Sequence, residues 1–236
     1  MRLTMPDRKP RQGFELACEL GFRPLAHMVA RALAPLRVPP PAVVIAGTAT
    51  GVAAAVAIGR HAFLAAALLL QLKTVLDNAD GQLARMTDRV TELGRYLDSE
   101  SDLLVDAAIF AALGIWIGAP LALMGFVLLT LVLSTNFNLE RRYRGAPVES
   151  DRSSALARVY TLLYGWQDRV FEKVFRGRPS RGTVGIVANF GLSTQLLALG
   201  VCLAFGHPVA YVAVLCACAL SLVSLMVAER RVQLAT

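Results

Sequence analysis

Residues 77–102 read DNADGQLARMTDRVTELGRYLDSESD, and this stretch carries two pairs of aspartates at helical spacing. Asp77 and Asp80 are three residues apart and Asp98 and Asp102 are four apart, so each pair lies on one face of a helix. Each pair also adjoins a strongly apolar segment. Because carboxylates at membrane depth are costly and mark functional sites, this stretch decides how the rest of the chain is interpreted.

The two aspartate pairs are expected to face each other. Only eight residues separate Arg85 from Gly94, so the two helices should be antiparallel neighbours with their carboxylates at one level. Four convergent carboxylates need compensating charge, and a set of oxygen ligands favours Mg²⁺, Mn²⁺ or Ca²⁺ over zinc. Two such ions would neutralise the four charges and could clamp a diphosphate.

Small and basic residues accompany the aspartates. Gly81, Ala84 and Gly94 leave the backbone accessible, so a nucleotide ring or a diphosphate could approach closely, and Arg85 could pair with a phosphate. Asp106 extends the stripe of aspartates by one more turn, and we expect it to support the site from beside it. The alternative is a structural network of ion pairs between the aspartates and the basic residues Lys73, Arg85, Arg89 and Arg95.

The composition predicts an all-α, polytopic membrane protein. Hydrophobic residues make up 56% of the 236 residues and charged residues only 17%, and the charges gather between apolar blocks. This pattern is typical of membrane-spanning helices of about 20 residues. A net charge of +7 also suits nucleic-acid binding, but the basic residues flank apolar segments. We therefore expect contact with membrane lipids and no nucleic-acid partner.

Six transmembrane helices are predicted within a single membrane domain, residues 1–236. Their approximate ranges are 42–58, 62–85, 94–117, 119–137, 183–205 and 208–228. Residues 1–38 are expected to form a cytoplasmic tail and an amphipathic surface helix, and residues 140–182 a cytoplasmic loop with a second surface helix. Nearly all basic residues fall on one side of this topology, which places both termini and the acidic stretch on the cytoplasmic side of the membrane. In a bacterium this would be the inner or plasma membrane.

The acidic stretch resembles the signature of the CDP-alcohol phosphotransferase (CDP-alcohol phosphatidyltransferase) family, D-x2-D-G-x2-A-R-x8-G-x3-D-x3-D. The six-helix layout and the amino-terminal surface helix are also similar to that family. The resemblance implies an enzyme that moves a substituted phosphate from a CDP-linked donor to an alcohol and releases CMP. It covers 26 residues and matches at every defined position: Asp77, Asp80, Gly81, Ala84, Arg85, Gly94, Asp98 and Asp102.

The resemblance also implies roles for these residues. The four aspartates would hold two divalent ions, Mg²⁺ or Mn²⁺, with Asp77 and Asp98 bridging them. Asp102 matches the aspartate that is assigned as general base in the family. A homodimer is implied as well. The positions that match the lining of the CDP-donor site are Asp80, Gly81, Ala84, Arg85 and Gly94.

The donor and the acceptor are less strongly indicated. CDP-diacylglycerol suits a site at membrane depth, and a soluble CDP-polyol such as CDP-inositol is the alternative donor. A small polar alcohol is expected as acceptor, and glycerol phosphate or inositol phosphate would suit a basic cluster at the inner end of the fourth predicted helix. Positive-inside anchoring explains that cluster equally well. It consists of Asn136, Arg141, Arg142 and Arg144.

A different class of function, a cation transporter, would also place aspartates within the membrane. Transporters usually carry internal repeats and helices that are broken near the midplane. No repeat is recognisable in this chain, and its aspartates lie at helix ends. The pattern therefore favours the enzyme.

Overall fold

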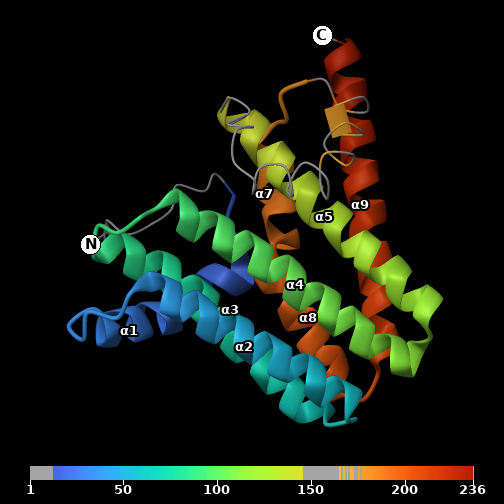
Figure 1. The fold of residues 1–236 in the computed structure, drawn as a ribbon. Coiled ribbons are helices and arrows are strands. Elements are labelled where there is room, and N and C mark those ends of the chain that lie inside the picture. The colour runs from blue at the N-terminus through green and yellow to red at the C-terminus, as the bar shows by residue number, and fades with distance from the viewer. Residues whose placement is uncertain are drawn as a thin grey trace. The chain divides into compact units, whose positions relative to one another are not determined.

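The computed structural model describes residues 13–145, 165, 167, 169, 171, 172, 175 and 177–235, and the regular elements in these residues are helices (Figure 1). This confirms the all-α prediction for the described part of the chain. In chain order the elements are the π-helix η1 (Cys18–Phe22), α1 (Arg23–Leu33), α2 (Pro40–Gly59), α3 (Phe63–Met86), α4 (Glu92–Ile117), α5 (Ala119–Arg144), α7 (Arg181–Val187), the 3-10 helix η2 (Ala188–Phe190), α8 (Leu192–Ala204) and α9 (Pro208–Ala235).

Three described helices are long and apolar enough to cross a membrane: Pro40–Gly59, Ala119–Arg144 and Pro208–Arg231. A fourth span results if the interrupted pair of Arg181–Phe190 and Leu192–Ala204 counts as one. The chain is therefore an integral membrane protein. Helices α3 and α4 have sufficient length, 24 and 26 residues, but both carry several charged residues. The count of six spans stays a prediction.

The predicted span 183–205 is interrupted at Gly191. Helix α7 ends at Val187 and the short helix η2 that follows it ends at Phe190, because Gly191 has extended backbone angles (φ −66°, ψ 165°) that no helix continues through. A Cβ atom at Gly191 would lie 2.7 Å from a carboxylate oxygen of Glu15, so a larger residue would have to displace that side chain. Hydropathy cannot reveal such a break, because both pieces are apolar.

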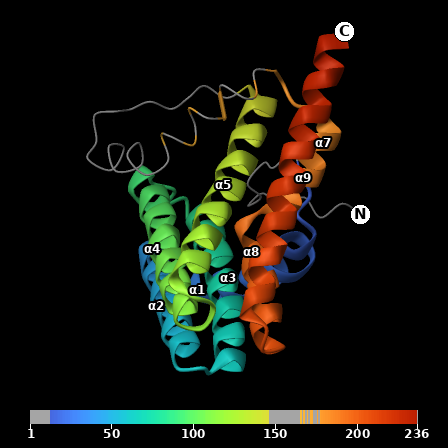
Figure 2. The same cartoon turned by 90° about the vertical axis from the view of Figure 1, so that its right-hand side faces the viewer.

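The chain divides into two compact units, which are described separately. The first comprises Leu16–Phe126 and Ser193–Val212. Helix α2 packs against both α3 and α4, and α1 packs against α3 (Figures 1 and 2). Helices α3 and α4 run in opposite directions along α2 (Figure 1), as predicted. The glycines of α2 permit this close packing; Gly51, for example, faces Val105 of α4.

The amino-terminal elements of the first unit agree with the predicted helical segment. A helix was predicted within residues 1–38, and η1 and α1 lie in that range, with Pro24 in the first turn of α1. Ala26 and Ala30 of α1 are fully buried, whereas Leu25 and Met28 are more than half exposed. An apolar exposed face suits a helix on a membrane surface, and that location stays a prediction.

The second unit comprises residues 13–15, Val127–Leu192 and Ala213–Thr236. Glu229 of α9 accepts hydrogen bonds from the Ser180 backbone N–H (2.7 Å) and the Thr183 hydroxyl (2.5 Å), which ties α9 to the start of α7. The apolar core of this unit contains Val132, Leu139, Phe171, Phe175, Val187 and Leu222.

Several predictions on the organisation of the chain concern residues outside the described part. The polar tail at residues 1–12 lies there, and so does most of the surface helix that was predicted within 140–182. That these segments belong with the rest to a single domain, residues 1–236, also stays a prediction.

Candidate functional site

Helix α3 has one apolar face, which is buried, and another face that carries the signature residues. Val75, Ala79 and Leu83 recur every four residues and are buried in an apolar cluster with Phe22 and Ala26 of the amino-terminal helices. The aspartates and the small residues of the signature fall between these positions on the helix. The apolar face therefore fixes the rotation of α3 and determines where its carboxylates point.

Polar contacts lock this rotation. The thiol of Cys18 donates to Oδ1 of Asn78 (3.2 Å), and the Asn78 amide donates to the carbonyl of Thr74 (2.8 Å). One turn further along α3, Oε1 of Gln82 lies 3.2 Å from Nδ1 of His27. Asn78 and Gln82, which directly follow the signature residues Asp77 and Gly81, thus anchor α3 to η1 and α1.

The turn between α3 and α4 positions the second aspartate pair. Asp88 has a positive φ of 52°, and the N–H of Arg89 donates to the carbonyl of Ala84 (2.7 Å), which closes the end of α3. Helix α4 then begins at Glu92 and is capped by Thr91, whose hydroxyl oxygen accepts from the Gly94 N–H (3.1 Å). A Cβ atom at Gly94 would lie 3.1 Å from that oxygen, so the cap itself favours glycine there.

Lys73 joins the two acidic helices. Its side chain is 1% exposed, and its Nζ is ion-paired with Oδ2 of Asp77 and with Oδ1 of Asp102, the latter at 2.5 Å. One ammonium thus binds a carboxylate of α3 and a carboxylate of α4. The proposed structural network of ion pairs is therefore present for Lys73. The side chain of Arg95 lies outside the described part, and Arg85 runs beside Gly81, with Nη1 3.4 Å from the position of a Cβ atom there.

The other signature aspartates lie near this ion pair. Asp80 is 6% exposed, and its Oδ2 is buried without a hydrogen-bond partner among the described residues. The charge of Asp98 interacts with those of Asp102, Asp80 and Asp77, so the four carboxylates form one electrostatic group. Asp106 is 4% exposed and interacts electrostatically with Asp102 and Lys73, which agrees with a place beside the site.

The chemistry of these residues fits divalent cations. The available ligands are carboxylate oxygens, which Mg²⁺ and Mn²⁺ prefer, and Oδ2 of Asp80 is buried without a hydrogen-bond partner among the described residues. Within the described part, however, no three acidic, histidine or cysteine side chains are arranged as a metal-binding group. Lys73 occupies the position between Asp77 and Asp102 where a cation would bind.

Gly47 of α2 is a site residue that the sequence did not reveal. A Cβ atom on Gly47 would lie 2.8 Å from Oδ1 of Asp77, so α2 passes directly beside this carboxylate. Gly47 is 30 residues away in the sequence and belongs to a helix full of alanine and glycine. Only the packing of α2 on α3 distinguishes it from the other small residues. The ion pair of Lys73 with Asp77 was easier to foresee from the sequence, because Lys73 precedes Asp77 by one helical turn.

The residues proposed to bind the acceptor lie in the second unit, and two of them already have partners there. Arg144 is ion-paired with Glu140 (2.6 Å), and the Arg142 guanidinium lies over the Phe171 ring, 5.2 Å from its centroid. Both contacts are compatible with anchoring as well as with anion binding.

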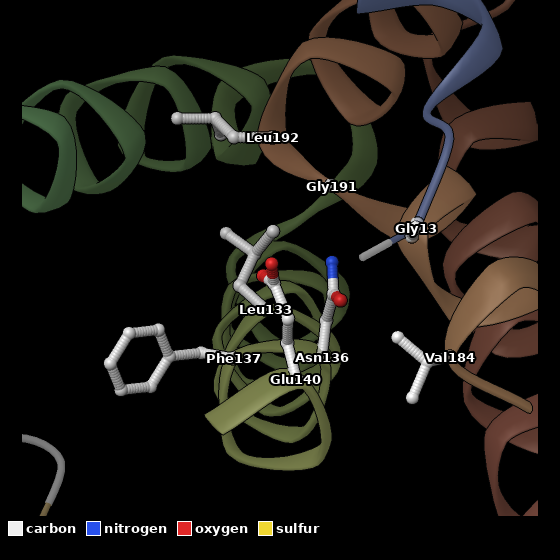
Figure 3. A pocket seen from close by; sticks show the side chains of 9 residues that line it. Gly13, Leu133, Asn136, Phe137, Glu140, Val184, Gly191 and Leu192 are labelled. Atoms are coloured by element: carbon white, nitrogen blue, oxygen red, sulfur yellow. The ribbon is translucent and has the colours of Figure 1, made fainter. Parts of the chain in front are cut away.

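Asn136 lines a cavity of about 150 Å³ in the second unit (Figure 3). Its amide and the carboxylate of Glu140 project from the same side of α5, whereas Phe137 points away (Figure 3). Gly13 and Gly191 contribute backbone to the lining. The cavity could hold a small polar group, with Glu140 as a negative rather than a positive contact.

Comparison with known proteins identifies a matching family and several relatives of parts of the chain. A model of the CDP-alcohol phosphatidyltransferase family matches residues 38–223. The archaetidylinositol phosphate synthase of Aeropyrum pernix is 33% identical over 129 residues, which cover 50% of this chain and 66% of the relative.

Two further relatives are each named a bifunctional IPC transferase and DIPP synthase. The protein of Aquifex aeolicus is 33% identical over 105 residues (44% of this chain, 24% of the relative). That of Thermococcus kodakarensis is 39% identical over 89 residues (34% and 19%). The matched regions thus span from about a fifth to two thirds of these relatives.

Proposed function

Because the chain belongs to the CDP-alcohol phosphatidyltransferase family, a family of phosphotransferase enzymes, we propose that it transfers a phosphatidyl-type group from a CDP-linked lipid to a small polar alcohol and releases CMP. The observation that carries this proposal is the pair of ion pairs by which Lys73 joins Asp77 of α3 to Asp102 of α4, within a signature that is matched at every position. Family membership also favours the enzyme over a cation transporter.

The proposed reaction uses the aspartates in two ways. Asp77, Asp80, Asp98 and Asp102 would hold two Mg²⁺ or Mn²⁺ ions, which when bound would polarise the phosphoryl oxygens and stabilise the departing CMP. Asp102 accepts the proton of the acceptor's hydroxyl group while the oxygen of that hydroxyl attacks the phosphorus. A bond between the acceptor oxygen and phosphorus forms, and the phosphorus–oxygen bond to CMP breaks.

The residues around the carboxylates shape the donor site. Gly81, Ala84 and Gly94 carry no more than a methyl group, so the CDP moiety can approach the backbone, and Arg85 can bind its diphosphate. The donor lipid would enter from the bilayer. We place this site and both termini on the cytoplasmic side, because the basic segments flank the acidic stretch. The active form is proposed to be a homodimer.

The acceptor is proposed to be a phosphorylated alcohol such as inositol phosphate. The name of the Aeropyrum pernix relative, archaetidylinositol phosphate synthase, supports this choice, as do Arg141, Arg142 and Arg144 at the end of α5. Arg142 and Arg144 already have aromatic and acidic partners. No such partner of Arg141 is known among the described residues, so Arg141 is the side chain to test.

Substitution of Arg141 by Ala is expected to raise the apparent KM for a phosphorylated acceptor about tenfold or more, because a charge-assisted bond to the phosphate is lost. The KM for the CDP-linked donor should change less than about twofold. Arg60→Ala, a change in the loop between α2 and α3, is the matched control. Steady-state kinetics of CMP release check this, and equal effects on both substrates would exclude an acceptor role for Arg141.

Substitution of Gly47 by Ala tests the packing of α2 on the site. The Cβ atom of the new alanine would press on the carboxylate of Asp77, which is ion-paired with Lys73. Because the carboxylate would be displaced, turnover should fall by about 10- to 100-fold. Gly59→Ala on the same helix is the control, because its Cβ atom would meet Ile115 at an ordinary 3.6 Å. CMP release is measured for both variants, and similar activities would show that Asp77 tolerates displacement.

The experiment that tests the proposed function is a substrate screen. Purified protein with Mg²⁺ is given CDP-diacylglycerol or CDP-inositol, each with glycerol 3-phosphate, inositol 1-phosphate, free inositol or serine. CMP release that requires CDP-diacylglycerol and one acceptor supports the proposal. The alternative donor is a soluble CDP-polyol such as CDP-inositol. Release from CDP-inositol alone would establish this alternative.

A further inference from the structure

Lys73 has an unusual position for a lysine in an acidic membrane site. It is 1% exposed and is among the largest fully buried side chains of the described residues. Its ammonium is ion-paired with two carboxylates of the signature, those of Asp77 and Asp102. A buried lysine normally needs compensating charge, and here the compensation comes from residues that are also expected to bind cations.

The balance of charge within the site is also informative. The four signature aspartates and Asp106 provide five carboxylates, and Lys73 provides one ammonium that interacts with Asp77, Asp102 and Asp106. When all these groups are ionised, four negative charges remain in excess, which two divalent ions would neutralise. When no ions are bound, the ammonium of Lys73 holds a carboxylate of α3 and a carboxylate of α4 together.

We propose that Lys73 is an internal counter-ion that competes with divalent cations for Asp77 and Asp102, so that tight metal binding depends on the diphosphate of the donor. This inference rests on the proposed function. The ammonium occupies carboxylate oxygens that a metal ion needs, so binding of an ion must displace or repel it. A bound diphosphate adds negative charge on the other side and offsets the repulsion, which couples the two ligands.

The test is Mn²⁺ binding to Lys73→Met, followed by electron paramagnetic resonance of the free ion, with and without CDP. In the absence of CDP, the variant should bind Mn²⁺ about tenfold more tightly than the original protein, because a neighbouring positive charge is gone. CDP should raise the Mn²⁺ affinity of the original protein at least about tenfold and that of the variant much less. Lys73→Arg keeps the charge and should resemble the original protein.

Thermal unfolding provides an independent readout. In EDTA, Lys73→Met should melt at a lower temperature than the original protein, because two neighbouring carboxylates lose their shared partner. Saturating Mn²⁺ should remove most of this difference. If Lys73→Met does not fold, Lys73→Gln, which keeps a hydrogen-bond donor but no charge, replaces it in both measurements.

Two results would overturn the inference: weaker or unchanged Mn²⁺ binding in the neutral variants, or a loss of thermal stability that Mn²⁺ does not repair. Either would make Lys73 a purely structural residue. Failure of the proposed function is seen separately, as the absence of CMP release from the original protein with every donor and acceptor. Mn²⁺ binding and its coupling to CDP are measured without turnover, so the two failures are distinguishable.

Discussion

Asp77→Asn and Asp98→Asn are each expected to lower CMP release by about 1,000-fold or more. Both aspartates match the positions that bridge two ions, and loss of a shared ligand removes several kcal/mol of transition-state stabilisation. Asp77 also lies at the centre of the described contacts, because it meets Lys73 and the α2 backbone at Gly47. The measurement is the initial rate of CMP release at saturating Mg²⁺.

Asp88→Asn is the matched control for these variants. Asp88 is an exposed aspartate in the turn between α3 and α4, with a positive φ of 52° that asparagine also accepts. The same chemical change should therefore leave both folding and turnover near their original values. Full activity in either Asp77→Asn or Asp98→Asn would contradict the proposed two-metal site, and loss in all three variants would indicate general destabilisation.

Asp102→Asn is expected to lower kcat by about 100- to 10,000-fold, because an amide cannot accept the proton of the acceptor hydroxyl. The variant also removes one partner of Lys73, so Mn²⁺ binding is measured in parallel. If Asp102 is the base, kcat should fall by a much larger factor than the affinity for the donor.

Asp106→Asn separates this role from a general effect of charge on α4. Asp106 lies one turn beyond Asp102 and is more deeply buried, but it is not part of the signature. We expect its substitution to reduce kcat less than about tenfold. A loss as large as that of Asp102→Asn would place Asp106 in the catalytic machinery and would remove the distinction drawn between the two residues.

The sequence predicted the helices of the first unit well. The predicted ranges 42–58, 62–85 and 94–117 correspond to α2 (Pro40–Gly59), α3 (Phe63–Met86) and α4 (Glu92–Ile117). These predictions rested on local signals, namely the apolar segments and the helical spacing of the aspartates.

Tertiary contacts could not be predicted from the sequence. The approach of Gly47 to Asp77 depends on how α2 packs, and the ion pair between Lys73 and Asp102 spans 29 residues. Gly191, where the fifth predicted span is interrupted, lies beside the carboxylate of Glu15, which is 176 residues away in the chain. Each of these features depends on two segments that meet only in the folded protein, so neither segment carries the signal alone.

In the candidate site, too, local features could be predicted from the sequence and tertiary contacts could not. The signature named the aspartates and their small neighbours because their spacing is fixed on each helix. It did not reveal that a lysine would bind one carboxylate from each pair, since an ion-pair network and a metal site use the same residues. The basic cluster at the end of α5 illustrates the limit most plainly: Arg142 and Arg144 have ordinary structural partners, Phe171 and Glu140.

The most direct test of the central claim is mass spectrometry of both products from purified protein, CDP-diacylglycerol, inositol 1-phosphate and Mg²⁺. We predict that CMP and a lipid phosphodiester form in equal amounts, that EDTA stops both, and that Asp77→Asn forms neither. CMP without the matching phosphodiester, or product formation that persists in EDTA or in Asp77→Asn, would contradict metal-dependent transfer by the aspartates of α3 and α4.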